Sequence, residues 1–213
     1  MKNFLDYKAW VIDFDGTFFY QLPVRIFMAA WLLIYYLPRP LHWKELFILM
    51  DYRRVREKLF AAESANFYEL QLKNLSERYN VGVEEILKIV TSWTIEKPQF
   101  LIKKFQRKKL IAAIKFAQLR GVKIVIYSDN QVDEKIKALD FVPDYAFWSD
   151  DDLIKCMKPD SKGLNNILNF LCLKPAEVLY IGDRDDRDGI CAKSAGVKYF
   201  DVREFTKNLS VSL

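Results

Sequence analysis

The sequence predicts a three-layer α/β fold, in which a parallel, Rossmann-like sheet carries an all-helical insertion. Short apolar runs rich in β-branched residues alternate with stretches of helical spacing, as is typical of parallel sheets covered on both faces. The stretch from residue 20 to residue 100 breaks this pattern, because it has helical spacing and no convincing strand. The length of 213 residues is enough for one domain of common size with a smaller domain inserted.

Five strands are expected from the apolar runs. They are AWVID (9–13), KIVIYS (123–128), DYAFWS (144–149), EVLYIGD (177–183) and VKYFDV (197–202). Helical spacing between them predicts helices over residues 132–139, 161–171 and 189–195. We therefore expect a core of residues 1–19 and 101–213 and a helical insertion of residues 20–100.

The net charge of +5 is unevenly distributed along the chain. Residues 20–109 carry 16 Lys and Arg against 9 Asp and Glu, whereas the rest of the chain carries 17 against 19. A basic segment can meet anionic substrates, nucleic acid or a membrane surface. Acidic residues are interleaved with the basic ones in DYRRVREKLF, as on an ordinary exposed helix. No basic-aromatic motif occurs, so we expect no nucleic-acid binding.

The most apolar run is IFMAAWLLIYYL, at residues 26–37. A helix that spans a bilayer needs roughly 20 apolar residues, so we expect no transmembrane segment here. The pattern favours a buried helix of the insertion, with a membrane-touching surface as the alternative.

The cysteines and the N-terminus favour a cytoplasmic protein. The three cysteines are far apart and form no CxxC pair, which is typical of reduced core residues. The N-terminal residues lack the pattern of a secretion signal. The only histidine, His42, lies outside any cluster, which argues against histidine-based catalysis.

Polar residues stand where the expected strands end. Asp13 and Asp15 follow the first strand, Ser128 ends the second, and Asp183 ends the fourth. Lys158 lies in the loop after the third strand. The carboxyl ends of parallel strands share one edge of the sheet, where ligands bind. Carboxylates, a hydroxyl and an ammonium group at such an edge suit Mg²⁺ and a phosphate group.

These residues resemble the motifs of the haloacid dehalogenase (HAD) superfamily. The run Asp13-Phe14-Asp15-Gly16-Thr17 resembles its DxDGT first motif, Ser128 resembles the second motif, and Lys158-Pro159 resembles the third. The run GDRDDRDG (182–189) resembles the fourth. The order and spacing fit most of the chain, and the helical insertion after the first motif resembles the family's helical cap.

The resemblance implies a Mg²⁺-dependent phosphatase that acts on a small phosphorylated substrate through an aspartyl-phosphate. Asp13 would attack phosphorus, and Asp15 would protonate the leaving oxygen and then deprotonate water. The metal ligands would be Asp13, the backbone carbonyl of Asp15, and Asp183. Ser128 and Lys158 would hold the phosphoryl oxygens. Dehalogenases of the superfamily attack carbon and lack the second acid, so Asp15 favours phosphoryl transfer.

Several assignments stay open at this point. Asp129 and Asn130 could bind substrate together with Ser128, and Ser128 could instead cap the following helix. Lys155 and Lys162 compete with Lys158, which the following Pro159 favours. Within the fourth motif, Asp188 is preferred to Asp186 as the second acid and metal ligand, because Gly189 begins the next helical pattern.

Two alternative functions remain. A phosphomutase on the same site would return the phosphoryl group to a substrate. A binding module could retain the fold without catalysis, although binding alone gives no reason for Asp15. The sequence indicates neither the substrate nor the oligomeric state.

Overall fold

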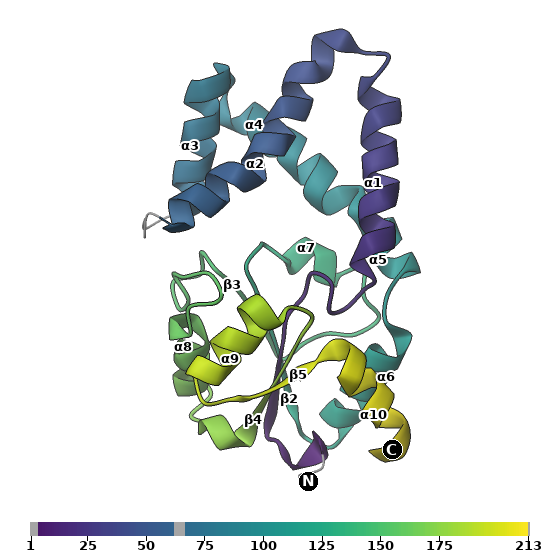
Figure 1. The fold of residues 1–213 in the computed structure, drawn as a ribbon, viewed down its shortest axis with the longest axis vertical. Coiled ribbons are helices and arrows are strands. Elements are labelled where there is room, and N and C mark those ends of the chain that lie inside the picture. The colour runs from purple at the N-terminus through teal and green to yellow at the C-terminus, as the bar shows by residue number, and fades with distance from the viewer. Residues whose placement is uncertain (1–3, 62–66, 213) are drawn as a thin grey trace. The chain divides into compact units, whose positions relative to one another are not determined.

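The computed structural model describes residues 4–61 and 67–212 and divides into two compact units. The core unit comprises Met1–Tyr20 and Gln106–Leu213, and the helical unit comprises Gln21–Phe105 (Figure 1). The sequence placed the second boundary between residues 100 and 101, a position that falls within α5 (Pro98–Lys104).

A five-stranded, fully parallel sheet in the order β3-β2-β1-β4-β5 forms the centre of the core unit. Its strands are β1 (Ala9–Ile12), β2 (Lys123–Ser128), β3 (Tyr145–Trp148), β4 (Val178–Gly182) and β5 (Lys198–Asp201). Each strand lies inside the apolar run that predicted it, which confirms the predicted α/β fold. The central strand β1 pairs with both β2 and β4, so that Val11 lies beside Val125 and Tyr180.

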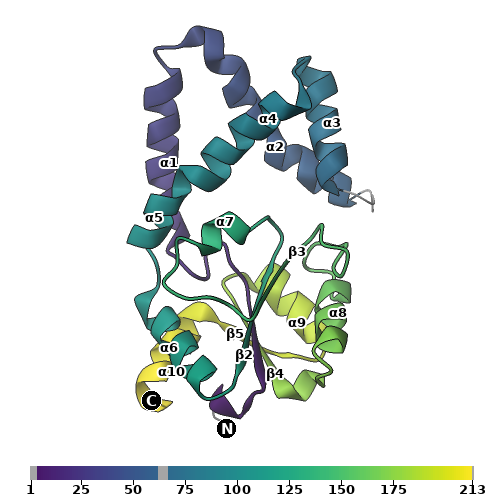
Figure 2. The same cartoon turned by 180° about the vertical axis from the view of Figure 1, so that it is seen from behind.

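Helices cover both faces of this sheet (Figures 1 and 2). On one face lie α8 (Lys162–Phe170) and α9 (Ile190–Ser194), and on the other lie α6 (Lys108–Leu119) and α10 (Val202–Ser212). On the first face, Val11 belongs to the same buried cluster as Leu164 and Cys191. On the second, the ring of Trp10 lies 5.3 Å from that of Phe205. Successive strand residues point to opposite faces, so burial of both faces requires uninterrupted apolar strands.

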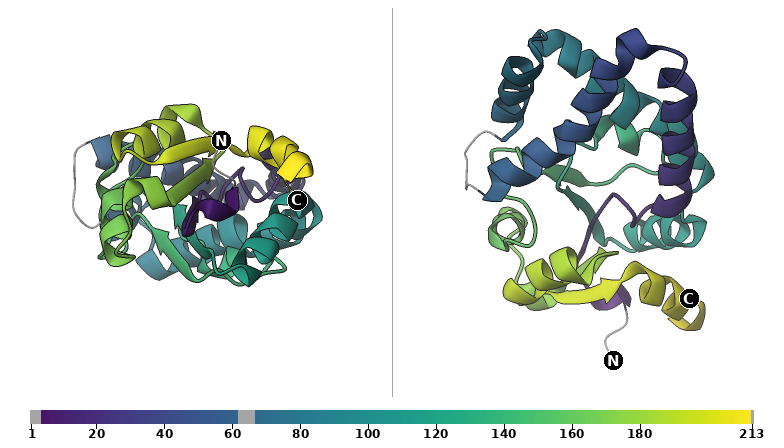
Figure 3. Two further views of the ribbon diagram at one scale, coloured as in Figure 1. Left: turned by 90° about the horizontal axis from the view of Figure 1, so that it is seen from below. Right: turned by 45° about the horizontal axis from the view of Figure 1, so that its top comes forward.

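The helical unit contains no strand among its described residues. Its elements are α1 (Gln21–Tyr36), the 3-10 turn η2 (Pro40–His42), α2 (Trp43–Ala61), α3 (Phe67–Tyr79), α4 (Val83–Thr91), the π-helical turn η3 (Ser92–Glu96) and α5. Its apolar centre is formed by Ile48, Leu72, Leu75, Ile86 and Val90. Within this unit, α1 runs along one side and α3 along the other (Figure 3).

The expectation that the apolar run at residues 26–37 is buried was wrong. Most of this run lies in α1, where only Val24 and Tyr36 are buried. The reason is that α1 packs along a single side, on which the rings of Trp31 and Tyr35 lie 6.1 and 5.4 Å from that of Trp93. No described helix is long and apolar enough to cross a bilayer.

Candidate active site

The carboxyl ends of β1, β2 and β4 lie side by side and carry the predicted polar residues. Asp13 directly follows β1, and its backbone N–H donates to the carbonyl of Ile181 in β4 at 2.9 Å. Ser128 is the last residue of β2, and Asp183 directly follows β4. Asp13 and Asp183 therefore leave neighbouring strands at the same edge of the sheet.

Lys158 lies among the carboxylates of this edge. Its ammonium group donates to Oδ1 of Asp13 at 2.5 Å and to Oδ1 of Asp188 at 2.7 Å. The side chain is 2% exposed, and a buried ammonium group needs such partners because desolvation of an unpaired charge is strongly unfavourable. Of the competing lysines, Lys155 pairs with Asp152 and Lys162 is exposed. The structure thus places Lys158 against the carboxylates of Asp13 and Asp188.

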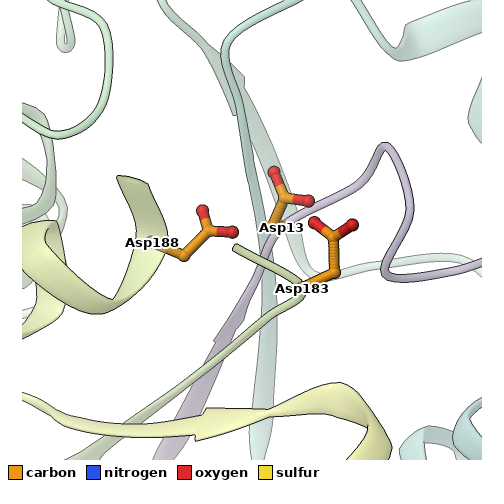
Figure 4. A group of neighbouring side chains, drawn as sticks. All are labelled: Asp13, Asp183 and Asp188. Atoms are coloured by element: carbon orange, nitrogen blue, oxygen red, sulfur yellow. The ribbon is translucent and has the colours of Figure 1, made fainter. Parts of the chain in front are cut away.

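Asp13, Asp183 and Asp188 form an acidic cluster. Each offers a carboxylate oxygen within 4.8 Å of those of the other two. Figure 4 shows their carboxylates gathered together, with Asp188 contributed by the segment that leads into α9. That segment is a π-helical turn, η5 (Asp185–Gly189), which the sequence did not predict, and the helix predicted for residues 189–195 follows it as α9.

Within η5, the structure separates Asp188, which the sequence favoured as the second acid, from the alternative, Asp186. Asp188 is buried and accepts hydrogen bonds from the hydroxyl of Tyr180 at 3.1 Å and the backbone N–H of Arg184 at 3.2 Å. Asp186 is exposed and pairs with the guanidinium of Arg184. Asp188 is thus the acid of this turn that joins the cluster.

Two glycines permit this close packing. Gly16 has φ +96°, and a Cβ atom there would lie 2.2 Å from Oδ2 of Asp183. A Cβ atom on Gly182 would lie 2.6 Å from the carboxylate of Asp188. Only glycine allows the turn after the first acid pair and the end of β4 to approach these carboxylates so closely.

Burial and mutual repulsion raise the pKa values of the clustered acids. Burial raises the pKa of Asp13 well above its ordinary value, with Asp188 adding to the shift and Lys158 opposing it. Burial and the nearby Asp188 raise the pKa of Asp183 to about 6. In both groups, burial and the neighbouring carboxylates together outweigh the attraction of Lys158.

A divalent cation fits this donor set. Oδ1 of Asp183 is buried and has no hydrogen-bond partner among the described residues. Carboxylate oxygens are the ligands that Mg²⁺ prefers. The acidic cluster could therefore hold such an ion, through Asp183 and Asp13 in particular.

Asp15 lies in different surroundings from Asp13. Its Oδ2 accepts a hydrogen bond from the side-chain amide of Asn130 at 3.2 Å, and the ammonium group of Lys135 lies 3.3 Å from its Oδ1. Asp13 instead accepts hydrogen bonds from Lys158 and from the hydroxyl of Thr17 at 3.1 Å. Among the described residues, the Asp15 side chain is not part of the acidic cluster. The other three predicted metal ligands belong to it through their carboxylates, whereas the predicted ligand atom of Asp15 is its backbone carbonyl oxygen.

The residues after β2 have separate contacts. Ser128 is buried and its Oγ accepts a hydrogen bond from the backbone N–H of Asn130 at 3.1 Å. Asp129 accepts a hydrogen bond from the backbone N–H of Lys158 at 2.9 Å, and its Oδ2 lies 3.6 Å from the guanidinium of Arg187. Asp129 thus links the loop of the second motif to that of the third.

Sequence reasoning missed three of these contacts. Lys135 and Tyr180 contact site carboxylates, and the guanidinium of Arg187 donates to the carbonyl of Lys158 at 2.8 and 3.1 Å. A lysine in a predicted amphipathic helix and a tyrosine in a predicted strand carry no local signal of such roles. The arginine lies inside the fourth motif, which was the only hint.

The family model for haloacid dehalogenase-like hydrolases matches residues 48–202. The match includes the second, third and fourth motifs and begins after Asp13 and Asp15, whose assignment rests on their own sequence and geometry. A search of curated proteins by sequence finds no match.

Solved structures with similar folds carry the names of different enzymes. The 2-haloacid dehalogenase of Pseudomonas syringae pv. Tomato DC3000 is 15% identical, with a TM-score of 0.61 over 91% of this chain and 85% of that one. A protein assigned as a beta-phosphoglucomutase from Thermotoga maritima is 17% identical, with a TM-score of 0.53 over 97% and 100%. A protein assigned as the HAD-hydrolase YfnB from Bacillus subtilis, in a crystal form with bound magnesium, is 14% identical, with a TM-score of 0.56 over 91% and 87%.

At these identities the likeness to solved structures concerns the fold. The family model matches well over half of the chain. The chain belongs to the haloacid dehalogenase-like hydrolases.

Proposed function

We propose that this hydrolase is a Mg²⁺-dependent phosphatase that hydrolyses a phosphate monoester through an aspartyl-phosphate intermediate. The observation that carries the proposal is Asp15, a second acid held by Lys135 and Asn130, apart from the acidic cluster. Displacement of a halide from carbon needs no proton donor, whereas an alcohol leaving a phosphate monoester does. A fixed second acid is therefore expected in a phosphatase and has no task in a dehalogenase.

In the first half of the reaction, a carboxylate oxygen of Asp13 attacks phosphorus. The new Asp13–phosphorus bond forms as the bond from phosphorus to the leaving oxygen breaks, and Asp15 gives that oxygen a proton. The hydrogen bonds from Lys158 and Thr17 fix the direction of the Asp13 carboxylate before substrate arrives. Such prior orientation lowers the entropic part of the barrier.

In the second half, water attacks phosphorus and Asp15, now a carboxylate, takes the proton from that water. The bond between phosphorus and Asp13 breaks, which restores the Asp13 carboxylate and releases inorganic phosphate. Asp15 is again protonated, so both acids return to their starting state and the atoms balance.

Asp13, Asp183 and the backbone carbonyl of Asp15 would hold Mg²⁺, and the unpartnered Oδ1 of Asp183 supports this assignment. When bound, the ion offsets the repulsion between the carboxylates and the phosphate and stabilises negative charge on the phosphoryl oxygens. Asp188 is already engaged by Lys158 and Tyr180, so its first task is to hold Lys158 in place.

Lys158 and Ser128 would contact the phosphoryl oxygens, since both stand at the sheet edge that carries Asp13. We assign the choice of substrate to the helical unit, because it is inserted directly after the first motif, as the caps of the family are. A small phosphorylated metabolite is the expected substrate class.

The test is hydrolysis of 4-nitrophenyl phosphate and of a panel of phosphorylated metabolites with Mg²⁺. Asp13→Asn should lower the rate by several orders of magnitude, whereas Asp186→Asn, on the exposed side of η5, should leave it unchanged. Full activity of Asp13→Asn would refute the assignment of Asp13 as the nucleophile. Halide release from a 2-haloacid, isomerisation of a sugar phosphate, or no turnover by the wild type would favour the dehalogenase, phosphomutase and binding-module alternatives respectively.

A further inference from the structure

The outward side of α1 is apolar along its whole length. Leu22, Ile26 and Leu33 of α1 share one helix face with Leu37, which directly follows α1 and continues its last turn, at positions i, i+4, i+11 and i+15. We call this row the α1 outer face. These four side chains are 59–72% exposed. Leu41, in the turn η2 that follows, is 95% exposed. Single exposed apolar residues are ordinary, but a continuous row of this length marks an interaction surface.

The other side of α1 is already used within the helical unit. Trp31 and Tyr35 pack against Trp93 on that side, where Val24 is also buried, and the ring of the buried Tyr36, at the flank of the outer face, lies 5.5 Å from that of Trp93. The outer face is therefore not a misplaced core face, because the core contacts of the helix are already made. What covers the outer face must come from outside this unit.

The segment that forms the outer face carries charges of one sign. Asp15 and Glu45 are consecutive acidic residues of the chain, so the whole segment between them lacks carboxylates. Within the same segment stand Arg25, Arg39 and Lys44, all exposed. A row of apolar side chains bordered by basic ones is complementary to a bilayer that contains anionic lipids.

A second copy of the chain suits this surface less well. Two-fold self-association brings the same patch of both copies together. It would bring the basic residues of one copy, which are Arg25, Arg39 and Lys44, close to the same basic set of the other, with no acidic residue in the segment to pair with them. Nor does α1 span a bilayer, because its 16 residues extend about 24 Å, less than the roughly 30 Å of a hydrocarbon core.

We propose that the α1 outer face, continued by Leu41, binds the surface of an anionic lipid bilayer. The helix lies in the plane of the interface with its leucine and isoleucine side chains among the acyl chains and its basic residues at the headgroups. This inference does not depend on the proposed phosphatase activity. It gives the basic charge of the helical unit a binding role and would bring the enzyme to the membrane.

The experiment is flotation of the full chain with vesicles, either of phosphatidylcholine alone or of two parts phosphatidylcholine to one part phosphatidylglycerol. We expect binding to the mixed vesicles that weakens as salt is raised. The triple variant Ile26→Ser, Leu33→Ser and Leu37→Ser should lower the partition constant by on the order of tenfold for each side chain. The double variant Arg25→Gln and Lys44→Gln should lower it about fivefold for each charge.

Matched controls come from the core unit. Leu119→Ser with Val142→Ser removes side chains that are 84% and 80% exposed, and Lys109→Gln with Lys193→Gln removes the same charge as the basic double variant. Both controls should bind vesicles as the wild type does. Asp13→Asn should also bind normally, which separates this proposal from the proposed catalysis. A circular-dichroism melt of each variant checks that it is folded.

Two results would overturn the proposal. One is a wild-type chain that stays unbound with the mixed vesicles at low salt. The other is equal loss of binding in the α1 variants and their core-unit controls. If sedimentation velocity instead finds a dimer that the triple serine variant dissociates, with no vesicle binding by the wild type, the outer face is an interface between copies.

Discussion

The ammonium group of Lys135 lies 3.3 and 3.4 Å from the two carboxylate oxygens of Asp15, a residue 120 positions away in the chain. Lys135 is 8% exposed and belongs to α7 (Asp133–Ile136), a single helical turn after β2. Asn130, in the same connection, donates to the same carboxylate. The segment after the second motif thus holds the acid of the first, and we infer that Lys135 is a positioning residue for Asp15.

Lys135→Met should separate substrates by their leaving groups. The change removes the ammonium group and retains an apolar stem of similar length, so Asp15 loses its direction while the site keeps its packing. Turnover of an alkyl phosphate should fall on the order of ten- to a hundredfold. Turnover of 4-nitrophenyl phosphate, whose leaving group needs little protonation, should fall much less. The measurement is kcat for both substrates.

The control for this variant is Lys137→Met, on the same short segment. Lys137 is exposed and pairs with Glu134, so its loss should leave both rates unchanged. An equal decrease for alkyl and aryl phosphates in Lys135→Met would contradict the positioning role and indicate a general loss of structure.

Asp15→Asn should trap the phosphorylated enzyme. With 4-nitrophenyl phosphate the first half of the reaction can proceed without a proton donor, but the second half lacks the base that activates water. Steady-state turnover should fall on the order of a hundredfold or more. Intact-protein mass spectrometry should then detect the added mass of one phosphoryl group. The double variant Asp13→Asn with Asp15→Asn should show none, and an unmodified single variant with normal turnover would refute the acid-base role.

The strands and motif positions were predictable because each depends on a local sequence pattern of apolar and polar residues. Strands buried on both faces must be uninterruptedly apolar, so their ends are visible where Asp13 and Asp183 begin. Parallel order then brings those ends to one edge, and this needs no knowledge of individual contacts. The partner of Asp15 was not predictable in this way. Lys135 meets it only through the pairing of β1 with β2.

Two other features depended on tertiary structure. The exposure of α1 could not be read from its periodicity, because the face with Trp31 and the face with Leu33 are both apolar and no polar stripe marks the outer side. The choice of Asp188 over Asp186 follows from the π-helical turn η5, which turns one carboxylate inward and leaves the other in solvent. The sequence favoured Asp188 but gave no sign of that turn.

Mg²⁺ should stabilise the folded protein through the acidic cluster. At a hundred times its dissociation constant, a ligand that binds only the folded state adds about 2.7 kcal/mol, which corresponds to a rise of roughly 5–10 °C in Tm for a chain of this size. Asp183→Asn should abolish most of this rise, because it removes the carboxylate with the unpartnered oxygen. Asp186→Asn should retain it. A thermal melt with and without Mg²⁺ measures both, and a full rise in Asp183→Asn would contradict the ligand assignment.

Asp144 joins β2 to the segment that leads into β3. Its carboxylate accepts hydrogen bonds from the backbone N–H of Ile124 at 2.9 Å and from the ammonium group of Lys123 at 2.9 Å. Burial acts to raise the pKa of Asp144, but these hydrogen bonds outweigh it and hold the pKa below its ordinary value. The ionised form is therefore favoured by folding.

Asp144→Asn should make stability less dependent on acid. Because the folded pKa lies below the unfolded value of about 4, Asp144 stabilises the fold above that pH and loses this contribution as pH falls through the folded pKa. At pH 7 the variant should lose about 1 kcal/mol of unfolding free energy, a modest amount because the side chain is 21% exposed. The difference from the wild type should shrink in acid. Urea unfolding at pH 7 and at a pH below the folded pKa measures this difference in unfolding free energy. The exposed Asp152→Asn is the control and should show no such change. A difference that stays constant with pH would exclude the ionised carboxylate as its source.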